Sequence, residues 1–239
     1  MKQKYIPFLI LISLTIFKVS SQIQIGSDII GTVSGDNFGE QVRMSSNGNI
    51  VAVLGDTNAS DGSVRVYENN GGNWVLYGTD SAGDNFGSIS ASSISLSYDG
   101  NTIAIGGFGL ARVYSYDSGI WTQVGMDIDN STSNSSFGSH ISISSDGTIV
   151  AVGTPRYNPE PSAGSIPPPI YYGLNQIFKY DSGNWNQLGN DIVGEQQMPV
   201  GSNSDRKISL SANGNRIAIE RIDFTKVYEI ISGVWTILG

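Results

Sequence analysis

The stretch ISISSDGTIVAVGT, residues 141–154, contains the pattern that decides the fold. Polar and apolar residues alternate up to Ser145, the pair Asp146-Gly147 follows, and a short apolar run then leads to Thr154. An Asp-Gly or Asn-Gly pair between two such runs is the strongest short-range signal of a β-hairpin, because a type I′ turn requires positive φ at both central residues. The stretch therefore predicts two antiparallel strands joined by a tight turn.

The same hairpin pattern occurs four times along the chain. Its turn pairs are Asn47-Gly48, Asp99-Gly100, Asp146-Gly147 and Asn213-Gly214. An alanine follows each glycine by four residues, at Ala52, Ala104, Ala151 and Ala218. A small residue at a fixed strand position indicates that a neighbouring sheet approaches closely there. After each hairpin come a third strand, a turn that contains glycine, and a strand that carries a tryptophan.

The tryptophans mark an internal repeat of about fifty residues. They are Trp74, Trp121, Trp185 and Trp235, and they begin the segments WVLYG, WTQVG, WNQLG and WTILG. The segment QIQIG at 22–26 aligns with these but lacks the tryptophan. Four strands per repeat without helical periodicity are typical of a β-propeller with four-stranded blades. We predict an all-β propeller with repeats at 22–73, 74–120, 121–184 and 185–234 and a final strand at 235–239; a β-solenoid or a sandwich is the alternative.

Further landmarks recur in phase with this repeat. They include the pairs Phe38-Gly39, Phe86-Gly87 and Phe137-Gly138, hairpins of the SLSxDG type and strands containing RVY. With these motifs, nearly all of 22–239 resembles the FG-GAP repeat family, the blades of integrin-α-like propellers, in the version found in secreted bacterial proteins. The resemblance implies an extracellular propeller with an adhesive or ligand-binding role, whose three phenylalanines pack between blades.

The number of repeats is smaller than the resemblance implies. Integrin-like propellers have seven blades, and this chain supplies about four. The chain could close as a small four-bladed ring, form part of a larger assembly, or be truncated. Both ends of the repeat region carry the same type of segment, at 22–29 and 235–239, and unpaired edges favour association. We therefore expect that the terminal blades could support self-association.

The first 21 residues have the layout of a secretory signal peptide. Lys2 and Lys4 precede about thirteen mostly apolar residues, and Val19-Ser20-Ser21 supplies small residues before a cleavage site at Gln22. We predict a signal peptide at 1–21 and a secreted or cell-surface protein; a retained anchor is the alternative. No later stretch approaches the ~20 consecutive apolar residues of a membrane span.

Charge and composition exclude several functions. The whole chain has a formal net charge of −8, which becomes −11 without the signal because ten basic and 21 acidic residues remain. Such an acidic surface disfavours nucleic acid as a partner. The chain has no cysteine and one histidine, His140, and lacks a G-x-S-x-G elbow. We therefore expect no enzymatic activity and no cofactor, and a hydrolase is the last alternative.

Two loops contain the candidate binding residues. Asp56, Asn58 and Asp61 approach the ligand pattern of a calcium loop, although the glycine comes one position late, and an Asx-rich turn is the other interpretation. The proline-rich insertion at 155–173 carries the candidate ligand-binding residues Arg156, Tyr157, Tyr171 and Tyr172. A tolerated surface insertion is its alternative.

The repeated tryptophans and tyrosines allow two interpretations. They either pack the blades or form a carbohydrate-stacking surface, and repeated aromatic residues are more often packing residues. We predict a non-enzymatic binding or adhesion module whose partner is an extracellular protein or a glycan; a lectin-like propeller is the alternative.

Overall fold

The computed structural model describes residues 23–31, 37–55, 64–80, 86, 91–107, 109–129, 136–157, 172–194, 207–221 and 224–239. These ranges contain strands and turns but no helix, so none of their segments is a helix long and apolar enough to cross a membrane. The predicted signal peptide, the calcium candidates Asp56, Asn58 and Asp61, and the loop residue Tyr171 lie outside the described residues.

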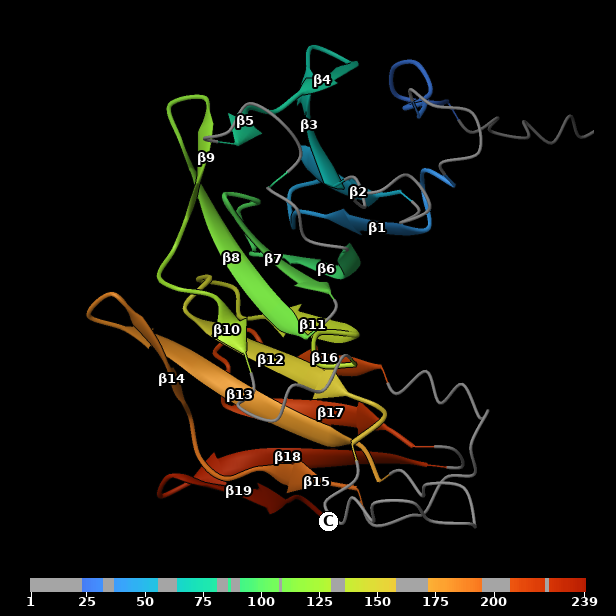
Figure 1. Cartoon of the computed structure of the whole chain (residues 1–239). Helices are drawn as coiled ribbons and strands as arrows, with labels where there is room; N and C mark the ends of the chain where they lie inside the picture. The colour runs from blue at the N-terminus through green and yellow to red at the C-terminus, as the bar shows by residue number, and fades with distance from the viewer. Residues whose placement is uncertain are drawn as a thin grey trace, which may run out of the picture.

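Four antiparallel sheets make up the fold, and we call them blades 1 to 4 (Figure 1). Blade 1 contains β1 (Gln41–Met44), β2 (Ile50–Leu54), β3 (Val64–Asn70) and β4 (Asn73–Leu76). Blade 2 contains β6 (Ala91–Leu96), β7 (Thr102–Gly107), β8 (Leu110–Asp117) and β9 (Ile120–Gln123). Blade 3 contains β11 (His140–Ile143), β12 (Ile149–Thr154), β13 (Leu174–Asp181) and β14 (Asn184–Gln187). Blade 4 contains β16 (Ile208–Leu210), β17 (Arg216–Glu220), β18 (Thr225–Ile231) and β19 (Val234–Ile237).

Three short strands lie beside the blades. β5 (Thr79–Asp80) pairs with β9 in parallel, while β10 (Ile128–Asp129) pairs with β8 and β15 (Ile192–Val193) with β13, both antiparallel. Within each blade the strands pair in chain order, from a first strand to the tryptophan strand. The all-β prediction is therefore confirmed, and the repeat limits that precede each tryptophan fall inside the fourth strand of a blade.

The Asx-Gly turns join the first and second strands, but their geometry differs from the predicted type I′. Only the glycine has positive φ, as at Gly147 (φ 75°), and Asp146 does not. The Asp146 carboxylate instead accepts from Ser144 Oγ (2.6 Å) and from the Thr148 amide (3.0 Å). The side chain thus holds a longer turn closed, so its own backbone need not adopt positive φ. Type I′-like geometry occurs at the other hairpin of the blade, where Ser118 and Gly119 both have positive φ.

Neighbouring blades bury the faces that they turn toward each other. The face toward the next blade, which we call the forward face, carries Ala52 and Leu54 in blade 1. These residues pack against the backward face of blade 2, which includes Ile103 and Ile105. The repeated alanines Ala52, Ala104 and Ala151 are completely buried, as the sequence pattern predicted. Ala218 in blade 4 is half-buried, because no described blade covers its forward face.

The blades follow one another in an open arrangement. Figure 1 shows blade 1 at the top, blades 2 and 3 below it, and blade 4 at the bottom, so the first and last blades lie at opposite ends. The first strands β1, β6, β11 and β16 contact one another in that order and form the inner edge. Over the part of the chain that the structure describes, the blades therefore form a propeller-like arc and not a closed four-bladed ring.

Candidate functional site

Three of the four tryptophans connect consecutive blades, and Trp74 connects blade 1 to the N-terminal segment. Trp121 Nε1 donates to the carbonyl oxygen of Tyr77 (2.7 Å), which directly follows the fourth strand of the preceding blade. Trp185 and Trp235 repeat this bond with Val124 and Leu188, both at 2.7 Å. Trp74 makes the same bond (3.1 Å) with the carbonyl oxygen of Ile25, in the segment that aligns with the tryptophan segments.

A glycine follows each acceptor carbonyl and leaves room for the tryptophan ring. Gly78 has a φ of 77°, and a Cβ there would lie 3.2 Å from Trp121 Cδ1 and 2.9 Å from the Gly119 oxygen. Together, the hydrogen bond and the glycine contact form what we call the Trp-Gly contact. Gly239 has a similar φ of 76°, but nothing lies within 4 Å of a Cβ there. Trp121 and Trp235 are only 1% and 4% exposed, so their rings cannot stack on a sugar.

The phenylalanines of the Phe-Gly pairs have packing roles, as predicted. Phe86 is buried against the rings of Tyr114 and Trp121, with centroid distances of 5.0 and 5.6 Å. Phe137 is completely buried and contacts Phe178 edge-on at 6.4 Å. At the end of the arc, Phe38 is half-buried beside Tyr67. The repeated aromatic residues thus belong to the architecture, and the interruptions of the repeat are the remaining candidates for a ligand site.

The main interruption is the insertion between β12 and β13, and its two ends are tied together. The amides of Tyr172 and Gly173 both donate to the carbonyl oxygen of Tyr157, at 2.9 and 3.4 Å. The Arg156 amide donates to Ser136 Oγ (3.2 Å), beside the buried Phe137. We call Arg156, Tyr157 and Tyr172 the loop neck.

Side chains of the loop neck are accessible. Arg156 is exposed, and both tyrosines are half-buried. The neck follows the end of β12 opposite to the Asx-Gly turn, so it lies on the face of the arc away from those turns. The structure thus brings three of the four predicted residues to one closed loop base through bonds of their backbones. Such a base presents a loop at a defined place on a rigid sheet.

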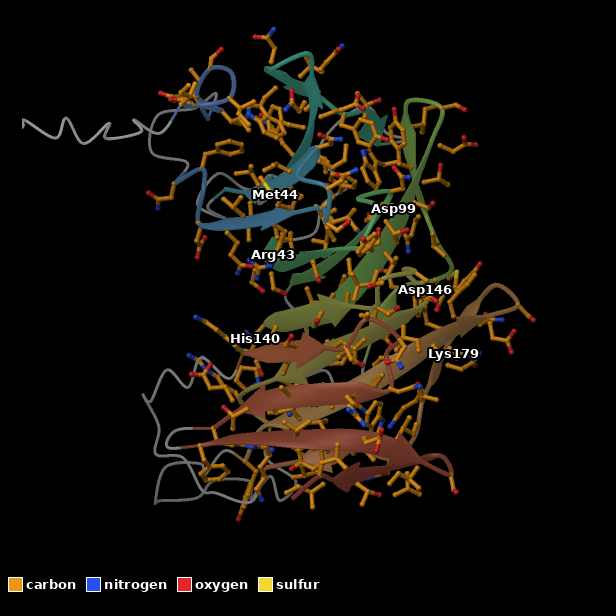
Figure 2. All side chains as sticks on the ribbon, turned by 180° about the vertical axis from the view of Figure 1, so that it is seen from behind. Arg43, Met44, Asp99, His140, Asp146 and Lys179 are labelled. Atoms are coloured by element: carbon orange, nitrogen blue, oxygen red, sulfur yellow. The ribbon has the colours of Figure 1, made fainter. Side chains whose placement is uncertain are left out.

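The inner edge is polar in a way that sequence reasoning missed. Gln41 Nε2 donates to the Ser92 carbonyl oxygen of the next blade (2.7 Å), and Arg43 donates to Gln41 Oε1 (3.4 Å). Partial burial lowers the pKa of Arg43 below its ordinary value. Figure 2 shows Arg43 and Met44 on β1 and His140 on β11, whereas Asp99, Asp146 and Lys179 lie toward the opposite side. His140 is half-buried and pairs with Gly153 across the β11–β12 ladder.

Two aspartates at equivalent positions of the repeat, Asp127 and Asp191, accept hydrogen bonds from side chains of their own blades. Asp127 accepts two bonds from Arg112 (2.8 and 2.9 Å) and one from Gln123 (2.8 Å). The Arg112 hydrogen bonds lower the pKa of Asp127, although partial burial works against them. Asp191 accepts from Gln176 and Gln187 in the same way. These carboxylates therefore hold strands and turns of their own blade together. The described ranges contain no group of three or more potential metal-ligating acids, histidines or cysteines.

No protein-family model and no curated protein matches the sequence. Solved structures do match its fold. A functionally unknown protein from Desulfotomaculum acetoxidans has 16% identity and a TM-score of 0.54, covering 83% of this chain and 54% of its own. A candidate 6-phosphogluconolactonase from Bacteroides fragilis has 15% identity and a TM-score of 0.52, covering 83% and 52%.

A third similar structure is the β-propeller domain of Cps50 (Swd1) from Myceliophteria thermophila. It has 10% identity and a TM-score of 0.50, covering 80% of this chain and 50% of its own. Identities this low support the fold alone, and the fold is propeller-like. This chain spans about half the length of the solved chains that it matches.

Proposed function

We propose that this protein is a secreted, non-enzymatic binding module that recognises its ligand through the loop neck and the insertion it closes. The geometry of the neck carries the proposal. Two backbone hydrogen bonds tie Tyr172 and Gly173 to Tyr157 at the end of a buried sheet. The neighbouring Arg156 amide donates to Ser136 Oγ, while the Arg156 side chain is exposed. Arginine and tyrosine are enriched in binding interfaces because they combine apolar area with hydrogen-bonding groups.

Other residues that could have served a ligand already have structural roles. The tryptophans donate to backbone carbonyls of the preceding blade, and Asp127 pairs with Arg112. The resemblance to FG-GAP repeats and the signal-like first 21 residues support an extracellular location and a partner that is a protein or a glycan. A lectin-like role within this proposal would use the tyrosines of the neck, because Trp121 and Trp235 are buried and all four tryptophans already donate to backbone carbonyls.

The test uses the mature chain, 22–239, on a glycan array and on a panel of immobilised extracellular matrix proteins. We expect binding that is lost in the triple variant Arg156→Ala, Tyr157→Ala, Tyr172→Ala. The matched control is Tyr98→Ala, an aromatic residue 65% exposed at an Asx-Gly turn, which should bind normally. Equal binding by both variants would refute the assignment to the neck.

A hydrolase is the competing proposal, because two similar structures are candidate 6-phosphogluconolactonases from Bacteroides species. Incubation with 6-phosphogluconolactone and a panel of simple lactones and esters separates the two. Turnover above the spontaneous rate would overturn the non-enzymatic assignment. We expect none, since the sequence has no cysteine, a single histidine and no G-x-S-x-G elbow.

A further inference from the structure

The joints between blades repeat the same contacts, and these contacts have a direction. At the turns of the inner edge, the amide of one blade donates to the carbonyl oxygen of the next. Ser46 donates to Tyr98 (3.0 Å), Tyr98 to Ser145 (2.9 Å) and Ser145 to Ala212 (2.8 Å). A second contact uses inner-strand serines: Ser142 Oγ accepts from the Leu210 amide at 2.9 Å, and Ser95 does the same for Ile143. The Trp-Gly contact is the third.

Each joint has one set of hydrogen-bonding groups on the forward face of a blade and a complementary set on the backward face of the next blade. Blade 4 carries the first set at one end of the arc, and blade 1 carries the second set at the other end. Blade 4 has the Ala212 amide, Ser209 Oγ, and the Leu238 carbonyl oxygen followed by Gly239. Blade 1 has the Ser46 carbonyl oxygen and the Met44 amide at the corresponding positions. Within the ranges that the structure describes, these two sets have no partner blade.

Exposed apolar side chains on blade 1 coincide with its unmatched set. Val42 and Met44 are 51% and 57% exposed. At the same two strand positions in blades 2 and 3, where a preceding blade covers them, Ile94 is completely buried, Ile141 and Ile143 are 6% and 7% exposed, and Leu96 is half-buried. Exposed apolar residues at positions that are otherwise buried mark an interaction surface.

We propose that a second copy of this chain covers the backward face of blade 1 with the forward face of its own blade 4. The contact continues the blade-to-blade joint that occurs three times within one chain. A head-to-tail contact of this kind closes into a ring when its rotation permits, and a second identical contact then uses the remaining two ends. Because the matched part covers about half of each solved propeller-like chain, two copies would together match the length of one such chain.

The forward face of blade 4 indicates how strong this contact is. Ala218 and Val227 occupy its centre, where blade 1 has Ala52 and Val66. Arg216 and Glu220 stand at its two margins, where blade 1 has Ile50 and Leu54. Long charged side chains can keep their ends in water while their stems pack, but burying them is costly. The association is therefore reversible and weaker than the joints within one chain.

The N-terminal segment competes with this association. Ile25 offers its carbonyl oxygen to Trp74, and Gly26 contacts the Trp74 ring. In the head-to-tail pair, Leu238 and Gly239 of the second copy would take the same place. Only one of the two segments can occupy Trp74 at a time.

Disulfide cross-linking tests the orientation directly, because the natural chain has no cysteine. Residues joined by one amide-to-carbonyl hydrogen bond lie close enough for a disulfide, whose Cα atoms are about 4.4–6.8 Å apart. The mature single variants Ser46→Cys and Ala212→Cys are mixed and oxidised at increasing concentration. The intramolecular variant Ser145→Cys, Ala212→Cys reproduces an established joint and should cross-link within the monomer.

We expect the mixture to form a disulfide-linked dimer of Ser46→Cys with Ala212→Cys, in much higher yield than the dimer formed by either variant alone. It also expects the unmodified mature chain to double its mass in light scattering as concentration rises. Gly26→Val, whose side chain collides with the Gly72 oxygen, should shift this transition to lower concentration by displacing the N-terminal segment. Cross-linking of Ser46→Cys with itself in equal yield would mean a head-to-head contact. A monomer at every concentration would overturn the proposal.

Discussion

The two end faces of the arc have the same backbone and nearly opposite surfaces. The forward face of blade 4 carries an ion pair between Arg216 and Glu229 (3.0 Å) and the exposed Glu220. The backward face of blade 1 exposes Val42 and Met44. Terminal repeats of stacked-repeat proteins need a polar outer face to remain soluble. Blade 4 meets this need by itself, whereas blade 1 exposes side chains of the kind that its neighbours bury. The same strand position is therefore a packing position when another blade covers it and a surface position when none does.

The largest expected effect contrasts a tryptophan inside the arc with the one at its end. Trp121→Ala removes a ring that is 1% exposed and contacts Tyr77, Phe86 and Tyr116, so we expect a loss of about 3–5 kcal/mol in unfolding free energy. Trp74→Ala, at the half-buried end position, should lose about 1–2 kcal/mol. Urea denaturation of both variants checks the difference. Equal losses would show that end and interior positions are equivalent.

The next largest effect on stability is expected from replacing one apolar residue of an inner strand with serine. Leu210 and Met44 occupy corresponding positions, but Leu210 is 9% exposed and Met44 is 57% exposed. We expect Leu210→Ser to lose about 2–4 kcal/mol and Met44→Ser less than about 1 kcal/mol. Denaturation at low protein concentration measures the monomer. A large loss for Met44→Ser under those conditions would mean that blade 1 is covered within its own chain.

A pair of glycines provides a control for backbone strain. Gly78 and Gly239 have φ values of 77° and 76°, but only a Cβ at Gly78 meets other atoms, 2.7 Å from Tyr116 Cε2. Gly78→Ala should lose about 2–3 kcal/mol, whereas Gly239→Ala should lose about 1 kcal/mol or less. Thermal unfolding of the two variants isolates the steric contribution. If both variants lose the same unfolding free energy, the positive φ alone explains why glycine occupies position 78.

The smallest expected effect is a pH dependence confined to the middle blades. Blades 2 and 3 close their turns with Asp99 and Asp146, while the end blades use Asn47 and Asn213. Partial burial works to raise the pKa of Asp146, but hydrogen bonds from Ser144 and Thr148 outweigh it, so the pKa is lowered. The same balance lowers the pKa of Asp99.

A lowered pKa in the folded state stabilises the protein above the unfolded-state pKa, near 3.9, and this contribution is lost as pH falls below it. Solvent screening keeps the contribution of these turns below about 1 kcal/mol. Asp99→Asn combined with Asp146→Asn should therefore flatten the loss of stability between about pH 5 and pH 3. Urea midpoints across this range measure it, with the unmodified chain as control. An unchanged pH profile would assign the acid sensitivity to other carboxylates such as Asp127.

Much of the fold follows from local patterns in the sequence. The hairpins, the buried alanines and the packing role of Phe86 and Phe137 are readable because each repeat contains its own turn residues and strand alternation. The Trp-Gly contact is harder to predict, since Trp121 and Gly78 lie in different repeats. Openness of the arc is harder still, because curvature arises from many small rotations between blades that no single motif encodes.

The candidate site was predictable only in part. Proline content and a break in the repeat pointed to the insertion, and the structure joins Arg156, Tyr157 and Tyr172 at its base. The partners of Asp127 were not predictable, because Arg112 lies on β8 and only the fold of the sheet brings it near. The polar contacts along the inner edge could not be predicted from the sequence, since Gln41 and Ser92 look like ordinary strand residues.

The Trp-Gly contact also has a consequence for how such a chain can lengthen. One sequence repeat, running from one tryptophan to the next, contributes the outer strand of one blade and the three inner strands of the following blade. Duplication of a whole repeat therefore inserts one more donor tryptophan and one more acceptor glycine, each already facing its partner. The number of blades can change in evolution without any new contact having to be invented, provided that the copy preserves this phase.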